Sequence, residues 1–270
     1  MQKRILEGQV ALVTGAGRGL GRAFAEKLAS LGCHVAVHGM REHGPSEFGG
    51  TQTLTDVAKA IGETHNVRTI KVLADLTIMD DVARTVRSAE AELGPIDILV
   101  HNAGGDIAAA GGKPDPNDVV NIKPEDVRAV IDRNLVSTIF VCQQVARVMM
   151  QRKRGRIITI GSVAAFKGRT HASIYATAKA GAMHFTRCLA DQMRAYDVTV
   201  NAIAPGDTRT ERFVGTRAVD PARLVTEGTL DRIATVDEVA RVIEFLAGPM
   251  SAFVSGQVIR VDGGGQMGPA

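Results

Sequence analysis

Short apolar runs alternate with helical patterns along the chain, and this alternation constrains the fold more than any other feature. Seven apolar runs have the length of buried strands, at residues 9–13, 34–38, 69–74, 97–101, 157–160, 198–202 and 257–261. Helical patterns lie between them, at residues 22–30, 55–63, 80–93, 124–151, 174–195 and 235–246. Strands that are connected through helices run parallel, and a parallel sheet is covered on both faces. We therefore predict an α/β fold with seven parallel strands and helices on both faces of the sheet.

No linker divides the chain, and its composition is that of an ordinary globular domain. The 270 residues contain no Pro/Gly/Ser-rich tract that separates two halves, so we predict one domain over residues 1–270. The net charge of +3 is too small to indicate nucleic-acid binding. The basic run at 152–156 closes a helical pattern, where cations complement the helix dipole. We expect no nucleic-acid partner.

The cysteines and the apolar runs indicate a compartment. Cys33, Cys142 and Cys188 are scattered and show neither metal-ligand spacing nor a disulfide framework. No apolar run approaches the ~20 residues of a membrane span, and the first strand begins too early for a cleavable signal. We predict a cytoplasmic protein without a metal site and without a membrane partner.

A glycine-rich turn follows the first strand directly and opens a helical pattern. Thr14 is followed by Gly15, Gly17, Gly19 and Gly21. Glycines let backbone N–H groups approach a pyrophosphate at the positive end of a helix. The order Gly-x-x-x-Gly-x-Gly over residues 15–21 differs from the usual G-x-G-x-x-G, and a purely structural turn is the alternative. We interpret the turn as a dinucleotide site.

The end of the second strand bears on which dinucleotide is bound. Sites for NAD place an Asp or Glu about 20 residues after the glycine turn, where it binds the ribose 2′-hydroxyl. That place holds His38, Gly39, Met40 and Arg41 here, without a carboxylate. Arg18 and Arg41 are available as partners for a 2′-phosphate, which favours NADP. NAD stays open, because Glu42 is adjacent and the shape of the loop at 41–53 is not predictable.

The stretch from Arg156 to Lys179 carries the candidate chemistry. Ser162 follows the fifth strand at its carboxyl end, where open α/β sheets bind ligands. Tyr175 and Lys179 lie one turn apart on one face of the predicted helix. An ammonium about 4 Å from a phenol stabilises the phenolate by roughly 4 kcal/mol at an effective dielectric of ~20. Lys179 could thus turn Tyr175 into a general acid/base, while Ser162 binds the oxygen of a carbonyl or an alcohol.

Other polar and small residues stand at strand ends or inside helices. Asp75 ends the third strand, where a side chain could meet an adenine, and Asn102, Ala103 and Gly104 follow the fourth strand. Asn134 falls inside the pattern at 124–151, where Asn is a poor helix former. The segment at 106–122, rich in Gly, Ala and Pro, lines a substrate pocket or is a surface insertion, and the sequence does not choose between them.

Together these motifs resemble the short-chain dehydrogenase/reductase family over about residues 8–265. The resemblance implies a Rossmann-type doubly wound sheet and hydride transfer between a nicotinamide and an alcohol/carbonyl pair. It implies that Tyr175 is the acid/base, that Ser162 orients the substrate oxygen, that Lys179 binds the nicotinamide ribose and that Asn134 holds a water in a proton relay. His101 and Thr208 depart from the usual pattern without removing a catalytic group.

The resemblance also implies the contacts of the cofactor and an assembly. Asp75 would contact adenine, and the segment from Pro205 to Thr210 the nicotinamide carboxamide. The full expected cofactor set is Thr14, Gly15, Gly17, Arg18, Gly19, Leu20, Gly21, His38, Gly39, Arg41, Asp75, Leu76, Asn102, Ala103, Gly104, Tyr175, Lys179, Pro205, Gly206, Thr208 and Thr210. Relatives commonly form homotetramers through the two long helices and the last strand.

The substrate is a small carbonyl or alcohol compound whose identity stays open. We expect residues 105–122 and 207–230 to form the substrate loops. Two basic clusters flank the candidate chemistry: Lys167, Arg169 and His171, and Arg209, Arg212 and Arg217. They indicate a polar or anionic substrate, although solvated loop charges would give the same pattern. An NAD-dependent alcohol or sugar dehydrogenase and a non-catalytic dinucleotide-binding regulator are the alternatives to an NADPH-dependent reductase.

Overall fold

The computed structural model describes residues 4–47, 49 and 51–268, and its centre is one parallel sheet of seven strands. The strand order is β3-β2-β1-β4-β5-β6-β7, and every pair of neighbours is parallel. The strands are β1 (Val10–Thr14), β2 (His34–Gly39), β3 (Thr69–Leu73), β4 (Ile98–His101), β5 (Gly155–Ile160), β6 (Val198–Pro205) and β7 (Val258–Val261). The predicted α/β fold with seven parallel strands is confirmed.

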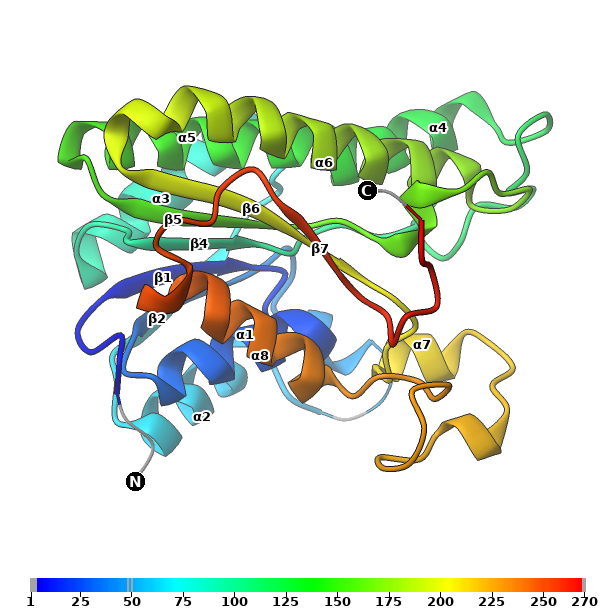
Figure 1. The fold of residues 1–270 in the computed structure, drawn as a ribbon, viewed down its shortest axis with the longest axis horizontal. Helices are drawn as coiled ribbons and strands as arrows, with labels where there is room; N and C mark the ends of the chain where they lie inside the picture. The colour runs from blue at the N-terminus through cyan, green and yellow to red at the C-terminus, as the bar shows by residue number, and fades with distance from the viewer. Residues whose placement is uncertain (1–3, 48, 50, 269–270) are drawn as a thin grey trace.

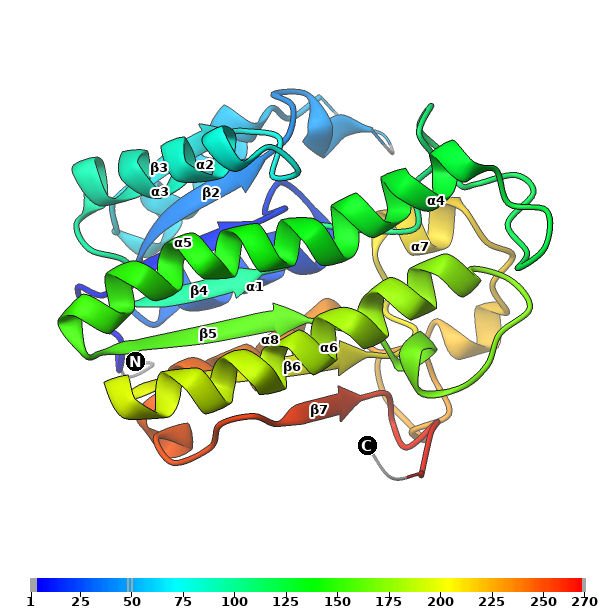
Figure 2. The same cartoon turned by 90° about the horizontal axis from the view of Figure 1, so that it is seen from above.

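Helices cover both faces of this sheet (Figure 1). Across one face lie α3 (Met79–Leu93), α5 (Ser137–Arg152) and α6 (Ser173–Met193), as Figure 2 shows. On the other face lie α1 (Gly19–Ser30), α2 (Leu54–His65) and α8 (Val236–Ala247). The arrangement is the doubly wound Rossmann type that the family resemblance implied.

The central strand β1 shows why the sheet forms. Ala11 and Val13 are fully buried in the core beneath α1, α2 and α8, while Val10 and Leu12 are buried in the core beneath α3, α5 and α6. A strand that is buried on both faces needs a continuous apolar run, which the sequence supplies here. Thr235 and Glu238 form a capping box at the start of α8, because the side chain of each accepts a hydrogen bond from the backbone N–H of the other.

The helical pattern at 124–151 is not one uniform α-helix. It begins as α4 (Pro124–Ile131), widens into a π-helical turn (Asp132–Val136) and continues as α5 to Arg152. Asn134 lies within this turn and is fully buried. Its amide donates to the carbonyl of Val130 at 2.8 Å and to the carbonyl of Gly105 at 2.9 Å. The turn therefore coincides with a side chain that ties the helix to the loop after β4.

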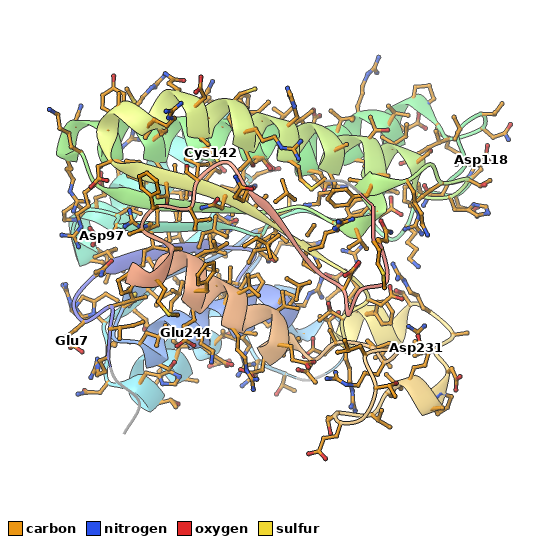
Figure 3. The ribbon with its side chains drawn as sticks, viewed as in Figure 1. Glu7, Asp97, Asp118, Cys142, Asp231 and Glu244 are labelled. Carbon is orange, nitrogen blue, oxygen red and sulfur yellow. The ribbon has the colours of Figure 1, made fainter. Side chains whose placement is uncertain are left out.

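All the strands point their carboxyl ends toward one end of the molecule, and the long loops gather there (Figures 1 and 2). The segments 105–122 and 207–230 both lie at this end, the second including α7 (Glu211–Gly215). Figure 3 shows Asp118 and Asp231 at this end and Asp97 at the opposite end. None of the helices in the described part of the chain has the length and apolar character needed to cross a membrane.

Candidate active site

Ser162, Tyr175 and Lys179 line one cavity of about 290 Å³ beyond the carboxyl end of β5. Ser162 follows β5 in extended conformation, and its hydroxyl accepts a hydrogen bond from the Ala164 N–H at 3.2 Å. Lys179 is buried on α6, and its Nζ lies 5.8 Å from the centroid of the Tyr175 ring. The same Nζ donates to the carbonyl of Ile160 at 2.7 Å. The strand end thus fixes both the serine and the lysine beside the tyrosine.

Burial dominates the titration of these groups. Burial lowers the pKa of Lys179 to about 8, because an ammonium is disfavoured away from water. Burial also raises the pKa of Tyr175, against a hydrogen bond from Ser162 and the positive charge of Arg212. We expected Lys179 to be the charge that lowers the phenol pKa. In the structure, Arg212 is instead the cation with the largest effect on the pKa of Tyr175. We did not predict this effect of Arg212 from the sequence.

A buried polar network joins the glycine turn to the end of β4. The Oγ1 of Thr14 accepts hydrogen bonds from the N–H groups of Asn102 and Ala103, both at 3.0 Å, and lies 3.1 Å from His101 Nδ1. Asn102 in turn donates from Nδ2 to the carbonyl of Gly15 at 3.1 Å. These bonds hold the two loops together, so Thr14 and the unusual His101 act within the protein scaffold.

His38 completes this scaffold from β2. Its Nδ1 accepts the Gly15 N–H at 3.2 Å, and its Nε2 lies 3.2 Å from the carbonyl of Ala74. These partners require a neutral ring that is protonated on Nε2. Burial lowers the pKa of His38 to about 4, which keeps the ring neutral. Both ring nitrogens are used inside the protein, so His38 positions the glycine turn from beneath.

A cleft of about 680 Å³ runs along the glycine turn and the ends of β2, β3 and β4. It is lined by most of the expected cofactor residues: Gly15, Gly17, Arg18, Gly19, Leu20, Gly21, His38, Gly39, Arg41, Asp75, Leu76, Asn102, Ala103, Gly104 and Thr210. The remaining ones, Pro205, Gly206, Thr208, Tyr175 and Lys179, line the adjoining cavity with Ser162. Both spaces are lined by Leu20, Asn102, Gly104 and Thr210, and by Arg212. Of the expected cofactor residues, only Thr14 lines neither the cleft nor the cavity.

The chemistry of the cleft fits a dinucleotide. The amino end of α1 has no side-chain cap and no acidic residue in its first turn, so its N–H groups are open to a phosphate. Gly21 has no room for a side chain, since a Cβ there would lie 2.0 Å from the carbonyl of Gly15. The turn therefore brings backbone donors close to the floor of the cleft.

Charged residues surround the end of the cleft near β2. Arg18 and Arg41 line it, and Arg18 Nη2 lies 2.7 Å from Glu47 Oε2. Glu42 is turned away, because Oε1 accepts from Thr55 at 2.5 Å and Oε2 from Lys71 at 2.9 Å. The hydrogen bonds from Thr55 and from Lys71 lower the pKa of Glu42 to about 2. The loop at 41–53 thus presents Glu47, rather than Glu42, to the cleft.

Asn134 holds the wall between cleft and cavity. Besides its two donated bonds, its Oδ1 accepts the Gly105 N–H at 2.9 Å. A Cβ at Gly104 would lie 2.6 Å from this oxygen. The helix and the loop after β4 therefore meet with no space between them, and residue 104 has to be a glycine.

The basic residues near Tyr175 divide into three groups. Arg169, Arg212 and Arg217 line the cavity with Tyr175, whereas Lys167 and His171 line a neighbouring cavity. Arg209 points elsewhere and donates to the carbonyl of Leu224. The sequence reasoning missed Lys113 and Phe213, which line the cavity with Tyr175, and Ile107 and Arg133, which line the cleft. Among the described residues, no cluster of His, Cys, Asp or Glu is placed to bind a metal.

Comparison with known proteins identifies the family. The model of the short chain dehydrogenase family matches residues 9–219. The chain belongs to this family. Short-chain dehydrogenases similar to it include the cyclohexanol dehydrogenase of Rhodococcus sp. (strain TK6), 36% identical with 96% of each chain covered. The 3-oxoacyl-[acyl-carrier-protein] reductase FabG of Escherichia coli (strain K12) is 34% identical, with 96% of this chain and 97% of FabG covered.

A solved short-chain dehydrogenase shows the same fold. The structure of 7α-hydroxysteroid dehydrogenase complexed with NADH and 7-oxo glycochenodeoxycholic acid superposes with a TM-score of 0.82. It is 28% identical and covers 97% of this chain and 96% of that one. The chain is therefore an oxidoreductase of the short-chain dehydrogenase type, whose members bind a nicotinamide dinucleotide and act on small molecules.

Proposed function

We propose that the chain transfers a hydride between NADP(H) and a carbonyl or secondary alcohol, with Tyr175 as the acid/base. The observation that carries this proposal is that Ser162, Tyr175 and Lys179 line a cavity that adjoins the cleft of the glycine turn. When bound, the nicotinamide supplies or accepts the hydride. The protein then has to bind the substrate oxygen and move one proton, and these two tasks match the three side chains.

Tyr175 and Ser162 divide these tasks. The raised pKa of Tyr175 keeps the phenol protonated at neutral pH, so it can donate its proton to the oxygen of a carbonyl that is being reduced. Ser162 hydrogen-bonds the same oxygen and stabilises the charge that develops on it. In the oxidation direction the phenol has to lose its proton first. The positive charges of Arg212 and Arg217 lower the pKa of Tyr175 and so favour this loss.

Lys179 and Asn134 position these groups. Lys179 is held by the Ile160 carbonyl and keeps further N–H donors that can reach a ribose hydroxyl in the adjoining cleft. The side chain of Asn134 bonds both the N–H and the carbonyl of Gly105. We assign it the role of fixing the wall of the site, while its place in a proton relay stays a proposal that rests on the family resemblance.

The charges around the cleft support NADP over NAD. Gly39 ends β2 and Met40 follows it, so neither position supplies a carboxylate, and Glu42 is bound to Thr55 and Lys71. Arg18 and Arg41 both line this end of the cleft and can pair with a 2′-phosphate. Glu47 is the acidic group that opposes this preference.

The experiment is an absorbance assay with NADPH and NADH and a panel of carbonyl compounds. Tyr175→Phe is expected to reduce turnover by at least about 100-fold and to leave the affinity for NADPH nearly unchanged, since only the proton donor is removed. The matched control is Tyr196→Phe, because Tyr196 is the second tyrosine of the chain and packs against the core away from both cavities. Equal rates for wild type and Tyr175→Phe would contradict the proposed role.

A further inference from the structure

Three cations from two segments line the cavity of Tyr175, and we name Lys113, Arg212 and Arg217 the basic wall. Lys113 comes from the segment 105–122, and the two arginines come from the segment 207–230. Lys113 Nζ donates to the carbonyl of Thr216 at 3.1 Å, and Arg212 Nη2 donates to the carbonyl of Asp106 at 2.9 Å. The wall is therefore built by contacts that join the two segments across the cavity.

The basic wall carries charge that the protein does not neutralise. Arg217 pairs with Asp207 at 3.5 Å, but in the described part of the chain no carboxylate lies within 4.0 Å of Lys113 Nζ or of the Arg212 guanidinium. Both bond backbone carbonyls instead. Besides Lys179, the cavity is lined by four cations, the basic wall and Arg169, and by two carboxylates, Asp106 and Asp207. The cavity wall is therefore net positive.

The positive charges of the basic wall repel one another, although Lys113 and Arg217 are exposed and solvent screens part of this repulsion. Burial lowers the pKa of Lys113, and the positive charges of Arg217 and Arg212 lower it further. Burial also lowers the pKa of Arg212, with Arg18 adding to the effect. Asp106 opposes both shifts, but it accepts a hydrogen bond from Asn117 and makes no ion pair with the basic wall. An anion bound in this cavity would relieve the repulsion.

Arg212 is placed to hold such an anion near the reacting oxygen. It is half-buried, it affects the Tyr175 phenol, and only one of its five N–H donors is used in a hydrogen bond that the structure shows. A guanidinium with free donors binds a carboxylate through two parallel bonds. Phe213 and Val163 line the same cavity and supply apolar surface for the carbon chain between the two polar ends.

We propose that the substrate is a keto acid or hydroxy acid, whose carboxylate binds the basic wall, chiefly Arg212, while its carbonyl or hydroxyl binds Ser162 and Tyr175. This inference rests on the proposed function and adds the substrate class to it. Arg212 is a specificity-determining residue in this assignment: it contacts the carboxylate, while Tyr175 transfers the proton.

The test measures kcat/KM with NADPH for 4-oxopentanoate and 5-oxohexanoate and for their methyl esters. The wild type is expected to prefer at least one acid over its ester by about tenfold to 100-fold, the range of a charge-assisted bidentate bond. Arg212→Met should bring the acid-to-ester ratio of kcat/KM to about one. The ratio is the readout, because loss of this cation also changes the titration of Tyr175 and with it the rates of both substrates. Arg209→Met is the matched control, since Arg209 is exposed in the same segment and lies outside the cavity, and it should keep the preference.

Each other outcome decides as well. Equal values for acid and ester in the wild type, or an unchanged preference in Arg212→Met, overturn the inference. If Arg212→Met is inactive on both acid and ester, Arg212→Lys is measured next. Ester turnover that returns together with the preference for the acid supports the inference. Ester turnover that returns without this preference, or that does not return, overturns the inference. If the wild type reduces no carbonyl compound with either cofactor, the proposed function fails. In that case the anion site is tested by calorimetry with 5-oxohexanoate. The inference requires that 5-oxohexanoate binds the wild type and binds Arg212→Met at least tenfold more weakly.

Discussion

The two sides of the carboxyl edge of the sheet are built in different ways. On the cofactor side, the glycine turn is fixed by buried bonds between strand ends, such as those of Thr14 with Asn102 and Ala103 and that of His38 with Gly15. On the substrate side, Lys113 and Arg212 reach across a cavity to backbone carbonyls of loops. We propose from this difference that backbone shape recognises the cofactor, while side chains on loops recognise the substrate.

The largest difference between the two sides is expected when one methyl group is added on each. At Gly21 a Cβ would lie 2.0 Å from the Gly15 carbonyl and 2.6 Å from Asn102 Nδ2. Gly21→Ala should lower the free energy of unfolding by about 3 kcal/mol and weaken NADPH binding at least about tenfold, because the turn cannot keep its shape. At Gly168, on the substrate side, a Cβ would meet nothing within 4 Å.

Gly168→Ala is therefore the control, with an expected change below about 0.5 kcal/mol. Urea unfolding and NADPH titration measure both quantities. Similar effects at the two positions would show that the cofactor side is no more rigidly built than the loops.

The second prediction concerns Lys179, which lies where the two sides meet. Burial lowers its pKa from 10.5 to about 8 in the folded protein. Between these values the unfolded chain binds more protons than the folded one, so the stability rises with pH across this window. Below pH 8 the burial of the charge costs up to about 3 kcal/mol, and this cost is relieved as the pH approaches 10.5.

The measurement is the difference in the free energy of unfolding between wild type and Lys179→Met, from pH 7 to 10.5. Tyr175 and all other groups are present in both proteins, so their own titration largely cancels in the difference. The wild type should gain on the variant above pH 8. A flat difference across this window would mean that Lys179 is not buried as a cation.

The sequence predicts the cofactor side well, because its cues are local. The strands β1 and β4 are short runs dominated by apolar residues, and the residues that directly follow β4, Asn102, Ala103 and Gly104, line the cleft. Ser162, Tyr175 and Lys179 come together for the same reason, since Tyr175 and Lys179 lie one turn apart on α6 and Ser162 closely follows the end of β5.

The substrate side is predicted poorly, because its residues depend on contacts between distant loops. Lys113 was missed, since the segment at 106–122 has no periodicity that fixes where its side chains point. The π-helical turn was missed as well, because the helical spacing of apolar residues continues on both sides of Asn134. Arg212, the cation with the largest effect on the pKa of Tyr175, lies 37 positions further along the chain.

The smallest expected effect concerns Glu47, a side chain on the cofactor side that bears on the preference for NADPH. Glu47 belongs to the unpredictable loop at 41–53, and its Oε2 lies 2.7 Å from Arg18 Nη2. A 2′-phosphate at this end of the cleft would be repelled by Glu47 and would compete with it for Arg18. Glu47→Gln should therefore raise kcat/KM for NADPH about threefold, a modest gain because the pair is partly exposed and screened by solvent.

The value for NADH should stay unchanged in Glu47→Gln, since NADH carries no 2′-phosphate. Glu63→Gln is the matched control: Glu63 pairs with Lys59 on the surface of α2 and does not line the cleft. The gain with NADPH should shrink as the salt concentration rises, as expected for an exposed charge. An equal gain with NADH would show that Glu47 acts on the shape of the loop, and the preference for NADP would then lose the support of Arg18.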